Sequence, residues 1–244
     1  MFERGSDQSK ARIAAPMSHS STASAGTQLI DTSVMPTLHT FFRRELRLAA
    51  GVIKGVAQGD RRRAGVVCDH LDFVTRSLHH HHTIEDDLLW PKLLERVPGE
   101  LAPIVHLMES QHERLGALLQ EIGSVLPEFR STADVETRDR LADLFDTVYA
   151  HLVEHLDAEE DRLLPIAARS LTPAEWQEMG EAGRSGTPRK ELSLSLGMYQ
   201  YEGAPEAIAQ MVAEAPAPVR WVVPRLSRRA FRKHALRIHG TATP

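Results

Sequence analysis

Four amphipathic stripes constrain the fold more than any other feature of this sequence. In each stripe, apolar residues recur at alternating steps of three and four, which places them on one face of a helix. The stripes run over residues 35–56, 67–88, 101–129 and 141–163. The breaks between them fall at Gly59-Asp60, Pro98-Gly99 and Ser131-Thr132. Four long helices with short connections predict an all-α fold, an antiparallel up-down-up-down four-helix bundle with a C-terminal helical extension.

The chain of 244 residues divides into three parts. Residues 1–33 are rich in Ser, Thr, Ala and Gly and lack periodicity, so we expect a disordered N-terminal segment. Residues 34–170 carry the bundle. Residues 171–244 predict a helical extension that begins after Thr172, with a linker over Gly183–Lys190 and a short helix within 205–214. Its basic tail, residues 216–240, contains seven Arg and Lys residues and no acidic residue.

Composition excludes several classes of protein. One cysteine, Cys68, excludes a disulfide framework and any cysteine-rich zinc or iron–sulfur site. The net charge is −4, so the chain is not a polycation of the kind that binds nucleic acid. We expect no nucleic-acid partner. No apolar run approaches the roughly 18 residues of a membrane span, and residues 1–33 lack the apolar core of a secretory signal. We therefore expect a cytoplasmic protein.

Six polar residues interrupt the apolar stripes at inward positions. They are His39, His81, Glu85, His112, His155 and Glu159. Charged groups are costly to bury without partners, so six of them on four helices require a shared reason. His39 lies about 19 residues before the end of the first helix, and His81 about 20 residues after the start of the second. In the other two hairpins, the numbers of residues between each polar residue and the connecting loop are also similar. All six side chains are therefore expected at one level of the bundle.

An internal repeat supports the same cluster. The segment from His81 through Glu85 to Pro91 matches the segment from His155 through Glu159 to Pro165, at an offset of 74 residues. In each copy, histidine and glutamate at positions i and i+4 share a helix face. Four imidazoles and two carboxylates without a thiolate suit iron or manganese, with zinc also compatible. We expect two ions, with both glutamates bridging and the histidines capping each ion.

At these residues the chain resembles the hemerythrin-like (HHE cation-binding) domains over about residues 35–168. The motifs that carry the resemblance are His39-Thr-Phe-Phe, His81-His82-Thr-Ile-Glu85-Asp86, His112-Glu113-Arg114-Leu115 and His155-Leu-Asp-Ala-Glu159-Glu160. The resemblance implies a four-helix bundle with a non-haem di-iron centre and a bridging oxygen species, manganese or zinc being less expected. Members carry or sense O2, handle peroxide or nitric oxide, or regulate iron and redox responses. The basic tail resembles that of actinobacterial members.

The sequence departs from the pattern of the oxygen carriers. Carriers place a second histidine one turn before the histidine of the third helix, where this chain has Met108, and they use His-x4-Asp on the fourth helix, where this chain has His-x3-Glu. The loss of an imidazole predicts open coordination. This favours a redox protein that reacts with peroxide or nitric oxide. If the protein is an enzyme, we expect a di-iron oxidoreductase with catalase-like or nitric-oxide-consuming activity. The alternative is a non-enzymatic sensor or binding protein for O2, redox state or iron.

Several other residues have less specific interpretations. His79 and His80 lie on a different face of the helix from the apolar stripe. His82 with Asp86 is an alternative i, i+4 pair to His81 with Glu85. The repeat aligns His81 with His155, so His81 is the preferred ligand, and His151 is expected beside the centre rather than on it. The expected surface residues are His70, His106, Arg43, Arg44 and Glu45. Cys68 is expected to be a buried filler.

The basic tail over residues 216–240 allows two interpretations. Its cations favour an acidic partner or an anionic membrane surface. Alternatively, the tail forms an amphipathic helix that packs Trp221, Val222, Leu226 and Phe231 against the bundle. A ferritin-like di-metal site is disfavoured, because its Glu-x2-His motif occurs once, at Glu109 and His112.

Overall fold

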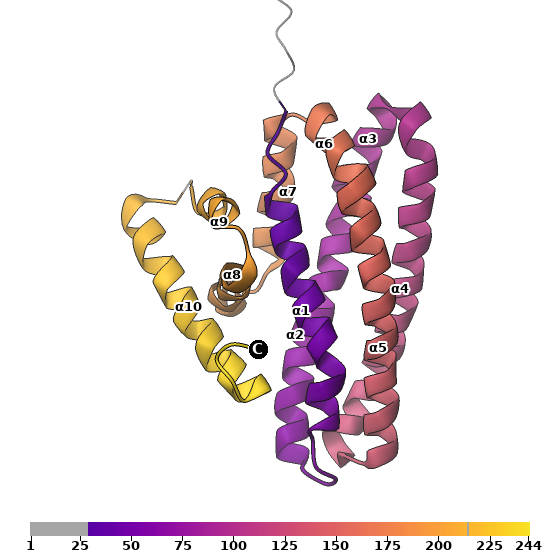
Figure 1. The fold of residues 1–244 in the computed structure, drawn as a ribbon, viewed down its shortest axis with the longest axis vertical. Helices are drawn as coiled ribbons and strands as arrows, with labels where there is room; N and C mark the ends of the chain where they lie inside the picture. Colours follow the sequence, from indigo (N-terminus) through magenta and orange to yellow (C-terminus); the bar gives the residue numbers. More distant parts are fainter. Residues whose placement is uncertain (1–28, 214) are drawn as a thin grey trace, which may run out of the picture.

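A computed structural model of the chain describes residues 29–213 and 215–244, and the predicted disorder of residues 1–28 falls outside this range. The described residues are helical and contain no strand. Four long helices form an antiparallel bundle (Figure 1): α1 (Val34–Lys54), α2 (Arg61–Ile84), α4 (Pro98–Thr132) and α5 (Val135–Ala158). α1 packs on α2 and α5, and α4 packs on the same two helices. The predicted all-α bundle is confirmed.

Short capped connections set the antiparallel order. Asp60 begins α2 by accepting a hydrogen bond from the backbone N–H of Arg63, and Asp134 begins α5 in the same way with Thr137. Between α4 and α5, Ala133 adopts a left-handed conformation with φ 52°, which reverses the chain within two residues. Both acidic caps also stabilise the positive end of the helix dipole.

The second and fourth long helices continue past their glutamates through single π-helical turns. The turn η1 (Glu85–Leu89) leads into α3 (Trp90–Arg96), and η2 (Glu159–Leu163) leads into α6 (Leu164–Ser170). In each case the glutamate carbonyl accepts a hydrogen bond from the backbone N–H five residues later. The two copies of the sequence repeat have equivalent π turns, so the repeat is present in the structure as well as in the sequence.

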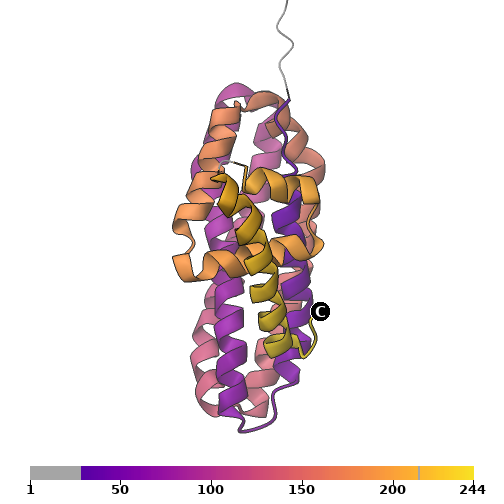
Figure 2. The same ribbon diagram turned by 90° about the vertical axis from the view of Figure 1, so that its left-hand side faces the viewer.

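Residues before and after the bundle pack against it. The N–H of Ile30 donates a hydrogen bond to the carbonyl of Ala168 at 2.9 Å, and the Ile30 side chain is buried. The disorder predicted up to residue 33 is therefore wrong for residues 29–33. After the bundle come α7 (Pro173–Gly186), α8 (Arg189–Glu202), α9 (Pro205–Met211) and α10 (Ala217–His239), which lie against α1 and α2 (Figure 2).

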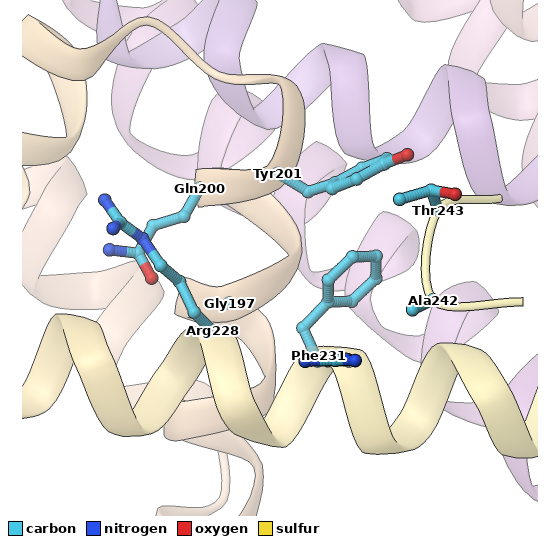
Figure 3. Close-up of a pocket in the computed structure, with 8 residues that line it drawn as sticks. Gly197, Gln200, Tyr201, Arg228, Phe231, Ala242 and Thr243 are labelled. Carbon is cyan, nitrogen blue, oxygen red and sulfur yellow. The ribbon is translucent and has the colours of Figure 1, made fainter.

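The linker predicted over Gly183–Lys190 is wrong, because only Thr187 and Pro188 separate α7 from α8. Gly186 ends α7 where a larger residue would overlap the ring of His80, so this glycine serves close packing rather than flexibility. Gly197 has the same role in α8, since a β-carbon there would overlap the Ser227 carbonyl of α10. A surface pocket of about 400 Å³ beside this crossing is lined by Gly197, Tyr201, Phe231 and the C-terminal residues (Figure 3).

α10 buries a different face than the sequence predicts, and this face packs mainly on α8. Its buried residues are Ser227, Phe231, Ala235 and Ile238, at steps of three and four. Phe231 is therefore buried as predicted, but Trp221, Val222 and Leu226 are 68%, 52% and 55% exposed. The steps of the buried face exclude these three apolar residues from it. An acidic partner or an anionic membrane for this helix stays a prediction.

Three residues expected on the surface are buried instead. Arg44, Glu45 and His70 are at most 2% exposed, because the C-terminal helices cover this side of α1 and α2. The apolar residues of the tail indicated packing against the bundle as one alternative, but not which side of the bundle the extension would cover. His106 is exposed and Cys68 is buried, as predicted. Within the described part of the chain, no helix has both the length and the apolar character needed to cross a bilayer.

Candidate metal centre

A polar layer separates two apolar cores in the interior of the bundle. One core contains Phe42, Leu78, Leu115 and Leu152, and the other contains Met35, Leu89, Met108 and Leu163. Each long helix crosses from one core to the other through a histidine. The layer holds His39, His81, His82, Glu85, His112, His155 and Glu159, all at most 9% exposed. The helices therefore place these side chains at one level, inside an otherwise apolar bundle.

The side chains in the layer form two groups of potential metal ligands. One group is His39, His81, Glu85 and Glu159, and the other is His82, Glu85, His112 and His155. Within each group, one ligand atom per residue lies within 4.8 Å of the others. Nitrogen and oxygen donors in this arrangement suit iron, manganese or zinc. Because Glu85 belongs to both groups, the layer has the form of a di-metal site.

The two oxygens of Glu85 point to different groups. Oε1 lies 3.2 Å from His81 Nε2, and Oε2 lies 3.6 Å from His112 Nε2. Glu159 Oε2 lies 3.3 Å from His39 Nε2 and 3.9 Å from His155 Nε2. Glu85 thus spans both groups with its two oxygens, which is the placement that a bridging glutamate requires. Glu159 approaches the imidazoles with Oε2 alone and belongs to the first group only, so the expectation that it also bridges stays a prediction.

Acidic side chains fix the orientation of two imidazoles. His39 Nδ1 donates to Glu160 Oε1 at 2.7 Å, and His112 Nδ1 donates to Asp86 Oδ1 at 2.8 Å. Arg43 in turn donates to Glu160, and the Trp90 indole donates to Asp86. A carboxylate on Nδ1 directs the Nε2 lone pair to a metal and makes the imidazole a stronger ligand.

These orientations leave the interior atoms without hydrogen-bond partners. His155 Nδ1 donates to Gln111, so the Nε2 atoms of His112 and His155 present lone pairs to each other across 3.2 Å. Likewise, the lone pair of His39 Nε2 faces the Glu159 carboxylate. Both oxygens of Glu85 and of Glu159 are buried without a hydrogen-bond donor. Facing lone pairs repel one another unless a cation lies between them, so this donor set fits bound metal ions.

The buried layer also shifts the titration of its members. Burial, together with the neighbouring imidazoles, lowers the pKa of His81, His82 and His155 well below its ordinary value. Burial, reinforced by Glu159, raises the pKa of Glu85 well above its ordinary value. Burial opposes ionisation of Asp86, but the hydrogen bond from His112 outweighs it and lowers the pKa. The imidazoles of His81, His82 and His155 are therefore neutral at neutral pH, and each has one unprotonated ring nitrogen available to a metal.

Comparison with protein families settles which family has this arrangement. The profile of the hemerythrin HHE cation binding domain matches residues 32–167, more than half of the chain. The chain belongs to the hemerythrin HHE cation-binding family. Comparison with curated proteins and with solved structures found no match. The hemerythrin domain covers the bundle and its polar layer, whereas α7 to α10 lie beyond the matched residues.

The hemerythrin domain brings together all six side chains that the sequence predicts as ligands. His39, His81, Glu85, His112, His155 and Glu159 each belong to one of the two groups, or to both. His151 belongs to neither group, and Met108 is fully buried in the apolar core beside the layer.

His82, expected from the sequence only as a rival to His81, joins His112 and His155 and stacks on the His112 ring at 4.1 Å between centroids. The roles of Asp86 and Glu160 were not predicted. In the sequence, both copies of the repeat place an acidic residue directly after the glutamate, and this shared feature could have indicated them.

Proposed function

We propose that this hemerythrin-domain protein holds two iron ions in the polar layer and reacts with hydrogen peroxide or nitric oxide, as part of a redox or oxidative-stress response. The observation that supports it most directly is the pair of ligand groups joined by Glu85. The carboxylate oxygens of both glutamates and the Nε2 atoms of His39, His81 and His82 are buried there without a hydrogen-bond partner. Bound iron would supply Lewis acidity and one-electron redox chemistry. Manganese and zinc suit the same donor types, and the family resemblance favours iron.

The number of protein ligands supports reaction with peroxide or nitric oxide rather than reversible O2 transport. Each group offers four side chains, and Glu85 is shared between them. Iron commonly takes six ligands, so both positions in the layer keep room for a small exchangeable molecule. His82 supplies a third imidazole to the second group, which revises the expectation from sequence of two imidazoles for each ion.

The surrounding residues exclude bulk water and hold the ligands in place. Leu78, Leu115, Leu89 and Met108 close the layer from its two sides and are fully buried. The Nδ1 partners keep the imidazoles of His39 and His112 in one tautomer. A dry and preorganised site of this kind admits small ligands such as peroxide or nitric oxide and rejects larger ones.

A second candidate function, a sensor without turnover, is supported by two adjacent arginines of α1. Arg43 donates to Glu160, which holds His39. Arg44 donates to Glu202 and to the Met198 carbonyl of α8. A change at the metal centre would therefore reach the C-terminal helices through one turn of α1.

Turnover assays separate the two candidates. Iron-loaded protein is expected to consume hydrogen peroxide or nitric oxide and to form no long-lived, reversible O2 complex. Glu85→Ala and Glu159→Ala should abolish this consumption, whereas Glu113→Ala, on the exposed side of α4, should retain it. An O2 complex that forms and releases O2 over repeated cycles, without peroxide or nitric oxide turnover, would contradict the proposal and favour the sensor or carrier.

A further inference from the structure

A separate cluster of metal-ligating side chains lies where the C-terminal extension meets the bundle. Glu45 comes from α1, His70 from α2 and His239 from the end of α10, and one ligand atom of each lies within 4.8 Å of the others. The side chains of Glu45, His70 and His239 are 0%, 1% and 5% exposed. None of them belongs to the two groups of the hemerythrin centre.

The spacing of the ligand atoms suits a small metal ion. Glu45 Oε2 lies 3.3 Å from His70 Nε2 and 3.2 Å from His239 Nε2. Hydrogen bonds between nitrogen and oxygen are typically shorter, at about 2.9–3.0 Å. Two ligands of a tetrahedral zinc ion, with bonds of roughly 2.0–2.1 Å, lie about 3.4 Å apart. His70 Nε2 is also buried without a hydrogen-bond partner, and it faces this point.

Neighbouring residues hold the cluster from outside. Arg44 Nε donates a hydrogen bond to Oε1, the other carboxylate oxygen of Glu45, at 2.8 Å. Oε2 therefore faces the two imidazoles. His234 Nε2 lies 3.1 Å from His70 Nδ1 and provides the outer partner that metal-bound histidines generally have. Both outer contacts leave the inward atoms Oε2 and Nε2 free to bind an ion.

We propose that Glu45, His70 and His239 form a third metal site, distinct from the di-iron centre, which takes a single zinc ion. Two imidazoles and one carboxylate are a common zinc ligand set, with a fourth position left to water. The ion would tie α10 to α1 and α2 and so fasten the extension to the hemerythrin domain. With the opposite tautomers, the same atoms form a metal-free hydrogen-bond chain, and the experiment below separates these arrangements.

The test uses full-length protein already loaded with iron, titrated with Zn²⁺ alone. We expect one further tight equivalent of zinc, with the iron content unchanged. His239→Gln keeps a side-chain N–H that can donate to Glu45 but removes the ligand, so it should weaken zinc binding at least about 100-fold. His106→Gln is the matched control, because His106 is exposed on α4 and lies outside the cluster, and it should bind zinc as the wild type does.

Two further readouts keep the proposal open to refutation if the variant folds poorly. Co²⁺ bound in place of zinc should give the intense visible absorption of a tetrahedral site in the wild type. Zinc should also slow hydrogen exchange in α10 of the wild type. An iron-loaded wild type without a further zinc equivalent, or equal zinc affinity in wild type and His239→Gln, would show that the cluster is a hydrogen-bond network only.

Discussion

Two histidine–carboxylate pairs orient imidazoles at the metal centre, and they occupy equivalent positions of the sequence repeat. Asp86 and Glu160 each follow a glutamate of the layer and each accept from an Nδ1. Loss of such an outer partner typically weakens metal binding 10–100-fold. We therefore expect Asp86→Ala and Glu160→Ala to lower iron affinity by about this factor, as measured by competition with a chelator. Their neighbours Asp87 and Asp161 are exposed, so Asp87→Ala and Asp161→Ala should leave the affinity unchanged.

His82 gives a second prediction at the residue scale. It lies in one ligand group with Glu85, His112 and His155, whereas its neighbour His79 is exposed on the same helix. His82→Gln should lower the iron content toward one ion per chain, because the second group then keeps three ligands, whereas the first group keeps four. His79→Gln should keep two ions. Equal iron content in both variants, by elemental analysis, would make His82 a packing residue.

The sequence predicted six residues of the layer because each replaces an apolar residue in a stripe. His82 escaped this reasoning, since the stripe rule assigns about one inward residue to each turn. A cluster with two ligand groups occupies a wider arc of the helix, so the adjacent His81 and His82 both face inward. Asp86 is exposed and Glu160 is half-buried at the edge of the layer, where polar residues follow no periodic pattern.

At the scale of elements, the two π turns decide how each glutamate meets the layer. Each turn inserts one extra residue between the glutamate and the following Pro91 or Pro165. The buried residues beyond the turn, among them Trp90 and Leu93, therefore keep their inward orientation while Glu85 also points inward. No periodicity rule predicts such a turn, because the stripes on either side differ by only one residue in phase.

Deletion of Asp87 tests the role of the π turn. This exposed residue lies within η1, and its removal restores the ordinary helical repeat. Either Glu85 or Trp90 must then rotate by about 100° out of the interior. We expect a lower melting temperature together with loss of bound iron, measured by circular dichroism and elemental analysis. Asp87→Ala keeps the turn and should behave as the wild type. A deletion variant with full iron content would refute this role.

The C-terminal helices show where prediction from sequence ends. The amphipathic stripes of the bundle are long enough to predict each helix and its inner face. In α10, arginines and apolar residues are interspersed, so several faces look equally suitable for burial. Its docking depends on Gly197 at the crossing with α8 and on the polar residues Glu45 and His70, which are distant in sequence. Such tertiary contacts leave no local periodic signal.

At the scale of the whole molecule, metal binding and stability are linked. Without metal, the layer keeps buried carboxylates and facing lone pairs in the interior, which is costly. Ions that bind only the folded chain add several kcal/mol at saturating concentration, which corresponds to about 10 °C for a domain of this size. We expect the iron-loaded protein to melt at least this much higher than the metal-free protein. Equal melting temperatures, with iron loading verified, would refute the linkage.

The metal-free protein should also lose stability on acidification. A folded-state imidazole pKa below the unfolded value of about 6.5 gives stability that is present above that pH and is lost as the pH falls toward the folded value. His81, His82 and His155 act in this direction. The raised pKa values of Glu85 and Glu159 act oppositely, since their contribution is lost as the pH rises through the folded values, but they are two groups against three. The melting temperature should therefore fall between pH 7 and 5, and a flat or rising profile would contradict this balance.

Anomalous diffraction from iron-loaded crystals, measured at the iron absorption edge, tests whether the polar layer holds two ions joined by Glu85. We expect two anomalous peaks per chain, about 3–4 Å apart. One should lie beside His39, His81 and Glu159, the other beside His82, His112 and His155, with Glu85 between them. A single peak in the layer, or two peaks without Glu85 between them, would contradict the account.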